Sequence, residues 1–182
     1  MGKVDPDISA PLGQWMERQP VFFVATAPLG AEGHVNCSPK GGDTFRVIDP
    51  LTVAYQDLTG SGAETLAHLR ENGRMVVMFC SFEDPPKIVR LHGQGEVLTG
   101  DHPDFATLMP LFPPHPGTRS IVRLTVTRVS DSCGYGVPLM ALQASRQALQ
   151  TWAEKKGENG LTTYRQQKNR LSIDGLPAWE DP

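Results

Sequence analysis

The sequence is poor in cysteine and contains no long hydrophobic run. Its three cysteines, Cys37, Cys80 and Cys133, form an odd set without Cys-x-x-Cys spacing, which argues against a disulfide framework and against a zinc ribbon. No apolar stretch is long enough to cross a bilayer, and the N-terminal stretch lacks the apolar core of a secretory signal. We therefore expect a cytoplasmic protein with reduced thiols.

The chain also lacks an excess of basic residues. It has 17 lysines and arginines against 20 acidic residues, and its isoelectric point is near 5.9. Such a balance gives no electrostatic footprint for nucleic acid. With 182 residues, 39% of them hydrophobic, the chain suits a single domain spanning residues 1–182.

Residues for protein-based catalysis are not arranged in any familiar pattern. The five histidines are scattered without metal-ligand spacing, so no metal site is expected. No Ser-His-Asp or Cys-His arrangement and no acid–base pair of carboxylates stands out. If the protein is an enzyme, we expect a cofactor to carry the reaction.

What the chain does have is a series of β-branched and aromatic runs. Strands are predicted over residues 21–27, 34–41, 45–58, 74–82, 87–100 and 119–136. Helical patterns fall between them irregularly, which excludes a parallel βαβ arrangement. The prediction is a mainly β fold with peripheral helices, an antiparallel six-stranded barrel in which Gly93 and Gly95 let a long strand bend.

Three helical segments are predicted around this barrel. An amphipathic N-terminal helix covers residues 7–19, and a second helix runs over residues 61–72 and stops at Asn72-Gly73. The C-terminal helix is predicted over 139–157, with Gly157 as its stop. The polar residues that follow it, up to residue 182, are expected to form an arm over another surface.

The stretch Thr59-Gly60-Ser61-Gly62 lies between a predicted strand and a predicted helix. One interpretation is a plain turn in which Ser61 and Glu64 form a capping box. The other is an anion site, because free backbone N–H groups and the helix dipole meet there. Local sequence leaves both open.

A second candidate is the stretch Asn36-Cys-Ser-Pro-Lys-Gly-Gly at residues 36–42. Strand alternation places Asn36, Ser38 and Lys40 on one face, which suits a polar heterocycle or a phosphate. A solvated edge face is the simpler alternative, and Cys37 is expected to be a small core residue on the other face. Asp57 is either a contact for a ring N–H or a turn-initiating residue.

A third candidate is Tyr135, which Gly134 and Gly136 flank. A small-residue loop with one aromatic side chain suits stacking on a ring or packing at a subunit interface. The alternative is a tight link from strand to helix.

Three stretches together resemble the pyridoxamine 5′-phosphate oxidase-like family of flavin-binding split β-barrels. They are FFVATAPLGAEGHVNCSPKGG, VAYQDLTGSGAETLAHLRENGRMVVMF and VRLHGQGEVL, in this order along residues 22–98. The resemblance is to a subgroup of flavin-nucleotide-binding members distinct from the true oxidases. True oxidases carry Ser-Arg-Lys at the start of the helix, where this chain has Ala63, Glu64 and Thr65.

The resemblance implies a homodimer that binds FMN at the subunit interface and acts as a flavin-dependent oxidoreductase on a small molecule. The alternatives are a non-catalytic flavin carrier or sensor and a deazaflavin-dependent reductase of the same fold. With the loop candidate added, the expected cofactor site comprises Asn36, Ser38, Pro39, Lys40, Gly41, Tyr55, Gln56, Asp57, Gly60, Ser61, Gly62, Thr65 and Tyr135.

Overall fold

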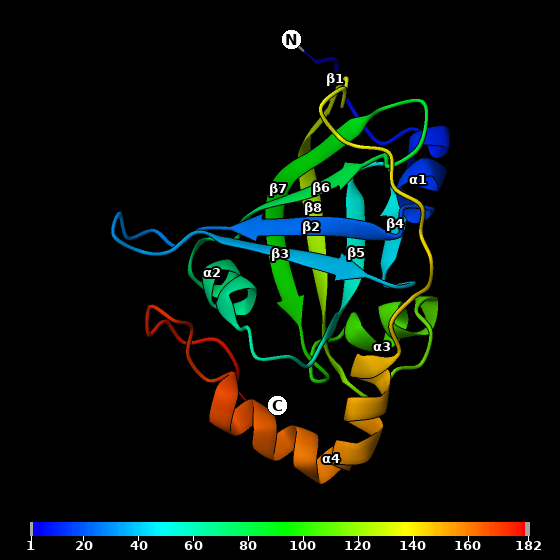
Figure 1. Cartoon of the computed structure of the whole chain (residues 1–182). Coiled ribbons are helices and arrows are strands. Elements are labelled where there is room, and N and C mark those ends of the chain that lie inside the picture. Colours follow the sequence, from blue (N-terminus) through cyan, green and yellow to red (C-terminus); the bar gives the residue numbers. More distant parts are fainter. Residues whose placement is uncertain (1, 181–182) are drawn as a thin grey trace.

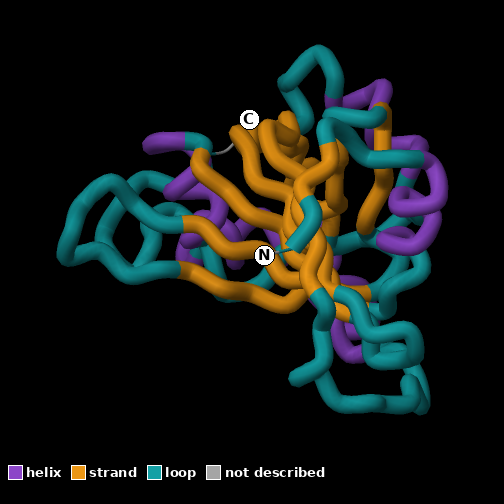
Figure 2. Tube along the Cα trace, turned by 90° about the horizontal axis from the view of Figure 1, so that it is seen from above, coloured by secondary structure: helices purple, strands orange, loops and turns teal. Residues whose placement is uncertain are grey.

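The computed structural model describes residues 2–180, which form one curled antiparallel sheet with helices outside it (Figures 1 and 2). The strands are β1 (Val4–Asp5), β2 (Val21–Thr26), β3 (Asn36–Gly41), β4 (Phe45–Asp49), β5 (Thr52–Leu58), β6 (Arg74–Cys80), β7 (Ile88–Leu98) and β8 (Thr118–Ser132). The helices are α1 (Ala10–Glu17), α2 (Glu64–Asn72), α3 (Phe105–Leu108) and α4 (Ala148–Lys168), with a 3₁₀ turn at Met109–Leu111.

The sheet has an open side. Its strand order is β3-β2-β6-β7-β8-β5-β4, with β1 added beside β8, so β3 and β4 are the two ends of the path. Because the sheet curls, β2 and β3 cross in front of β5 in Figure 1. The predicted antiparallel split barrel is confirmed. The structure has eight strands, because β1 adds one and a turn at Asp49-Pro50 divides the predicted 45–58 strand into β4 and β5.

The bend predicted from glycine in the long strand is present as a bulge. The register of β7 against β8 shifts between His92 and Gly93. A Cβ atom on Gly93 would lie 1.9 Å from the carbonyl oxygen of Thr125, so only glycine lets the two backbones approach this closely. The bulge allows β7 and β8 to curve around the interior together.

The interior is filled by the inward faces of the strands. An aromatic cluster of Phe22, Phe45, Tyr55 and Phe79 has ring centroids 4.8–5.6 Å apart, in tilted and edge-on arrangements. Aliphatic residues of β6, β7 and β8 surround this cluster. The core therefore joins β2 and β6 to β4 and β5 and fixes how β2 and β5 lie relative to each other.

Helix α2 ends as predicted but begins later. Gly73 adopts the left-handed conformation, with φ 69°, directly after Asn72, which confirms the predicted stop. The first helical residue is Glu64 and the N-cap is Ala63, with no side-chain capping bond. The predicted capping box between Ser61 and Glu64 is therefore wrong, because Ser61 lies in the turn before the helix.

The terminal helices also differ from their predicted limits. Helix α1 is shorter than 7–19 and buries Leu12 and Met16. Residues 139–147 are not helical but extended and exposed, since their apolar side chains find no face to bury and propensity alone does not hold a helix. Gly157, with φ 63° and ψ 173°, is a kink inside α4 and does not end it.

The arm after α4 returns to the barrel and packs on α2. Ala178 and Trp179 are buried against Ala63, Leu66 and Ala67. The arm was predicted to follow Gly157 and to run to residue 182, whereas residues 158–168 belong to α4 and residues 181 and 182 lie outside the described residues. The arm also brings the end of α4 next to the turn that precedes α2, at the bottom of Figure 1.

The bulge generates a stability prediction. Gly93→Ala should lower the free energy of unfolding by about 1–3 kcal/mol, because the new methyl group collides with backbone of β8 that cannot move aside. The measurement is urea unfolding followed by tryptophan fluorescence. Gly136→Ala is the matched control, since a Cβ there meets nothing within 4 Å. Equal stability of the two variants would contradict the role given to Gly93.

Candidate functional site

Strands β3 and β5 meet through side chains across the open side of the barrel. The ammonium Nζ of Lys40 on β3 lies 3.5 Å from Oδ1 of Asp57 on β5. The same ammonium group lies 5.8 Å from the centroid of the Tyr55 ring. Lys40, Tyr55 and Asp57 were predicted site residues, and the structure brings them together although β3 and β5 are not paired.

Asp57 is the fully buried centre of this group. Arg119 donates through Nε to Oδ2 of Asp57 at 2.7 Å, and Ser120 donates to the same oxygen at 3.3 Å. Burial alone would raise the pKa of Asp57, but the charges of Arg119 and Lys40 and these hydrogen bonds hold that pKa below its ordinary value. The carboxyl group is therefore ionised at neutral pH.

The charges in this group do not balance. Asp57 and the buried Arg119 neutralise each other, so the ammonium of Lys40 adds one positive charge in surplus. The Lys40 side chain is 24% exposed, whereas Asp57 is fully buried, so the surplus charge sits at the accessible edge of the group. An anion placed there would balance it.

Several buried polar atoms beside Lys40 have no hydrogen-bond partner among the described residues. They are Oγ of Ser38, the hydroxyl of Tyr55 and Oδ1 of Asp57. Burial also raises the pKa of Tyr55 well above its usual range, so its hydroxyl stays protonated. Buried polar atoms without partners are rare in folded proteins, and three in one place indicate a position for a ligand.

Asn36 and Thr65 belong to a neighbouring polar network. The Asn36 side-chain amide donates to Oγ1 of Thr26 at 3.2 Å and to Oγ1 of Thr65 at 3.0 Å. Thr26 in turn contacts Nδ1 of the buried His68 at 2.9 Å. Burial lowers the pKa of His68, so the imidazole is neutral, and the network ties β3 to α2.

The 59–62 turn is held through its oxygen atoms. The side-chain amide of Asn169 donates to the carbonyl of Gly60 at 2.8 Å and to that of Ser61 at 3.3 Å. Arg119 donates through Nη1 to the carbonyl of Gly62 at 3.0 Å. Arg165 donates through Nε to Oγ1 of Thr59 at 2.9 Å. Residues of β8 and α4 therefore fix the turn.

A cavity of about 850 Å³ opens beside Lys40. Four predicted residues line it, namely Pro39, Lys40, Gly41 and Gln56, together with His115 and Arg146 among others. This volume is in the range that accommodates a drug-sized ligand or a cofactor. Gln56 is fixed beneath the cavity, since its side-chain amide donates to Thr118 at 2.8 Å and to the carbonyl of Pro113 at 3.2 Å.

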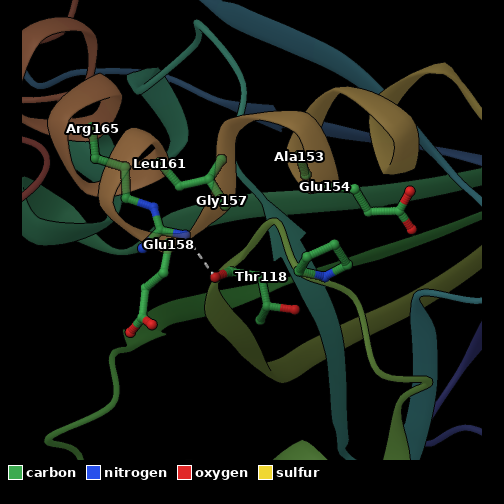
Figure 3. A pocket seen from close by; sticks show the side chains of 8 residues that line it. Thr118, Ala153, Glu154, Gly157, Glu158, Leu161 and Arg165 are labelled. Carbon is green, nitrogen blue, oxygen red and sulfur yellow. Dashed lines mark hydrogen bonds between the residues drawn. The ribbon is translucent and has the colours of Figure 1, made fainter.

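A smaller cavity of about 400 Å³ lies on the other side of Thr118, under the kink of α4 (Figure 3). Figure 3 shows Arg165 reaching the carbonyl oxygen of Thr118, a hydrogen bond of 2.9 Å. Since Arg165 also bonds Thr59, this side chain links α4 to the base of the site. Gly157, the kink residue of α4, lines this small cavity.

Two residues singled out in the sequence lie outside the Lys40 group, and the expectation for one of them, Cys37, is wrong. Tyr135 is 82% exposed in the segment after β8, so its predicted role in stacking or at a subunit interface stays a prediction. Cys37 is exposed and not a core residue, because β3 is an end strand whose outer face is uncovered. The remaining predicted residues lie in the Lys40 group, in the Asn36 network, along the cavity or in the 59–62 turn.

Sequence reasoning missed the residues that support the site from far along the chain. These are Arg119, Arg165 and Asn169. Nothing in the local sequence of Arg119, Arg165 or Asn169 distinguishes them as site residues. Within residues 2–180 no group of histidine, cysteine and carboxylate side chains is placed to hold a metal, and no helix is long and apolar enough to span a membrane.

The fold defines the class of protein. The Group A Streptococcus protein HupZ aligns with a TM-score of 0.51 and 20% identity, covering 67% of this chain and 91% of its own. A Lactobacillus delbrueckii protein aligns with a TM-score of 0.54 and 17% identity, covering 70% and 97%. At these identities the likeness shows the fold alone, a split β-barrel.

The sequence comparisons then give the family. Residues 11–133 match the family described as pyridoxamine 5′-phosphate oxidase. The pyridoxamine 5′-phosphate oxidase family protein ustO of Aspergillus flavus is 41% identical over 188 residues, which cover 94% of this chain and 75% of the relative. The chain therefore belongs to the pyridoxamine 5′-phosphate oxidase family, as its sequence motifs indicated.

The buried ion pair generates a prediction with a pH signature. Asp57→Asn should lower the free energy of unfolding by about 3–5 kcal/mol at pH 7, because Arg119 would remain buried without a counter-charge. Since the folded pKa of Asp57 is lowered, its stabilisation is present above the ordinary value of 3.8 and is lost as pH falls through the lower folded value.

Urea unfolding at pH 7 and at steps below pH 4 measures both effects. The variant should lose the part of the acid-dependent decline that Asp57 causes in the native protein. Asp7→Asn, at an exposed position, is the matched control. An acid decline that is the same in all three proteins would refute the role of Asp57.

Proposed function

We propose that this protein binds a flavin, specifically FMN, and uses it as an oxidoreductase acting on a small molecule. The observation that carries the proposal is the surplus charge of Lys40, which lines a cavity of about 850 Å³. On the interior side of the sheet, Ser38, Tyr55 and Asp57 add three buried polar atoms without a hydrogen-bond partner among the described residues. A phosphorylated, polar ring system supplies the anion and the hydrogen-bonding groups that these residues lack. Membership of the family supports the same reading.

The residues present fit such a group. Lys40 would hold an anionic part, and Ser38 and Tyr55 would offer hydroxyl groups to polar atoms of the ring. Asp57 would accept from a ring N–H through Oδ1. Pro39, Gly41 and Gln56 would form the wall on which the ligand lies.

The chain's own residues bind and orient in this proposal. Bound flavin would supply hydride or electron transfer, which the protein's side chains cannot perform. Arg119 keeps Asp57 ionised, and the buried Tyr55 stays protonated, so one acceptor and one donor are fixed at neutral pH. The aromatic core behind Tyr55 keeps water away from that side of the site.

A non-catalytic flavin carrier of the same fold is the second candidate. It is favoured by the sequence, in which no acid–base pair of carboxylates and no Ser-His-Asp or Cys-His arrangement stands out. Reduction of the bound flavin by nicotinamide donors separates the two functions. Turnover with a donor supports the oxidoreductase, and flavin binding without reduction supports the carrier.

We also propose that two copies associate. Residues 133–147 carry exposed apolar side chains, among them Tyr135, Leu139, Met140 and Leu142. An apolar patch of this kind is typical of an interface. Light scattering on the purified protein gives the mass, and a monomer at micromolar concentration would refute the association.

The direct test of flavin binding is an absorbance spectrum of the purified protein, followed by mass spectrometry of what heating releases. The expected result is the pair of bands of oxidised flavin and the mass of FMN. A colourless protein that also takes up no added FMN would refute the proposal.

Lys40 generates a prediction on affinity. Lys40→Ala should weaken FMN binding by about 1.5–3 kcal/mol, because the ligand loses a charge-assisted partner. Fluorescence titration of FMN measures the dissociation constant. Lys155→Ala, an exposed lysine of α4, removes the same charge elsewhere and should bind as the native protein does. An unchanged constant in Lys40→Ala would remove Lys40 from the site.

A further inference from the structure

The carboxylate of Glu64 folds back over the 59–62 turn. Glu64 is the first residue of α2, and its Oε2 accepts from the backbone N–H of Ala63 at 3.1 Å. The same oxygen lies 3.1 Å from where a Cβ of Gly62 would stand. The start of α2, where unpaired N–H groups favour an anion, therefore already has a carboxylate of the chain itself.

The turn directs its amides toward that side. The carbonyls of Gly60 and Ser61 point to Asn169 and that of Gly62 points to Arg119. In a trans peptide the N–H points opposite to the preceding C=O, so the next three amides face away from these donors. The third of them, on Ala63, is the one that Glu64 accepts from.

A separate observation places this turn beside the ligand position. Arg119 bonds both the carbonyl of Gly62 and Asp57, whose Oδ1 is ion-paired with Lys40 but accepts no hydrogen bond from the described residues. The side chain of Thr65, in the first turn of α2, interacts with the buried Tyr55 hydroxyl and lowers its pKa, although burial raises that pKa more strongly. A ligand that satisfies these atoms reaches the edge of the turn.

We propose that Glu64 is a specificity-determining residue that disfavours phosphate at the start of α2. The inference rests on the proposed flavin function and concerns which flavin is preferred. Lys40 attracts an anionic ligand. Glu64, in contrast, already accepts the N–H of Ala63 at the start of α2, and its negative charge repels a phosphate that the helix end would otherwise stabilise. The anionic part of the ligand is then held by Lys40 and not by the start of α2.

The test compares two ligands that differ only by the phosphate. Dissociation constants of riboflavin and FMN are measured by fluorescence titration for the native protein and for Glu64→Gln. The glutamine keeps an oxygen that can accept from Ala63 and removes only the charge. We expect FMN to bind about tenfold more tightly to the variant and riboflavin to change by less than about twofold.

Glu32→Gln, at an exposed position between β2 and β3, removes the same charge and should change neither constant. A parallel titration at high salt should shrink the effect of Glu64→Gln, since the repulsion is electrostatic. Thermal unfolding of all three proteins confirms that they are compared as folded molecules.

The outcomes separate the two proposals. Flavin binding with an FMN-to-riboflavin preference that Glu64→Gln does not raise would overturn the role of Glu64 and leave the flavin function standing. Failure of every protein to bind either flavin would overturn the flavin function, and this inference with it. If Glu64→Gln and Glu32→Gln raise the FMN-to-riboflavin preference equally, the change comes from the net charge of the protein. That result would also overturn the role of Glu64.

Discussion

The contact of Lys40 with Asp57 closes the open side of the barrel, and the candidate site depends on it. The strands that carry these residues lie far apart in the hydrogen-bonded order of the sheet, so only side chains bridge them. A buried carboxylate is costly unless it is paired, and Arg119 supplies that pairing from β8. Because the pair is complete, Lys40 keeps its charge available, and the cavity beside it acquires a cationic wall.

Arg119 also connects the buried ion pair to the turn before α2. Arg119 bonds Asp57 on one side and the carbonyl of Gly62 on the other, so the ion pair and the turn are held by one side chain. Arg165 and Asn169 add bonds from α4, which the arm keeps in place by burying Trp179 against α2. Loss of packing at the arm would therefore weaken the hydrogen bonds that hold the 59–62 turn, although the arm does not line the cavity.

Local patterns were enough for the strands, the antiparallel class, the stop at Gly73 and the shared face of Asn36, Ser38 and Lys40. These features depend on alternation and on backbone conformation, which neighbouring residues determine. The supporting residues could not be predicted in this way. Arg119 and Asn169 lie 57 and 109 positions from the carbonyls they bond, and only the closed topology brings them there. The first part of the helix predicted over 139–157 is wrong for a related reason, since the apolar side chains of residues 139–147 stay exposed.

The structure gives the glycines of the 59–62 turn a different role from the two that the sequence indicated, a plain capped turn and a site for a bound anion. Neither Gly60 nor Gly62 has a left-handed backbone, so conformation does not require glycine there. A side chain at Gly60 would meet only the Leu58 carbonyl at 4.0 Å, whereas one at Gly62 would stand 3.1 Å from the Glu64 carboxylate. The missing side chain at Gly62 thus leaves room for a negative charge that the chain supplies itself. The turn therefore packs around the carboxylate of Glu64, and a ligand that reaches the turn must bind beside this negative charge.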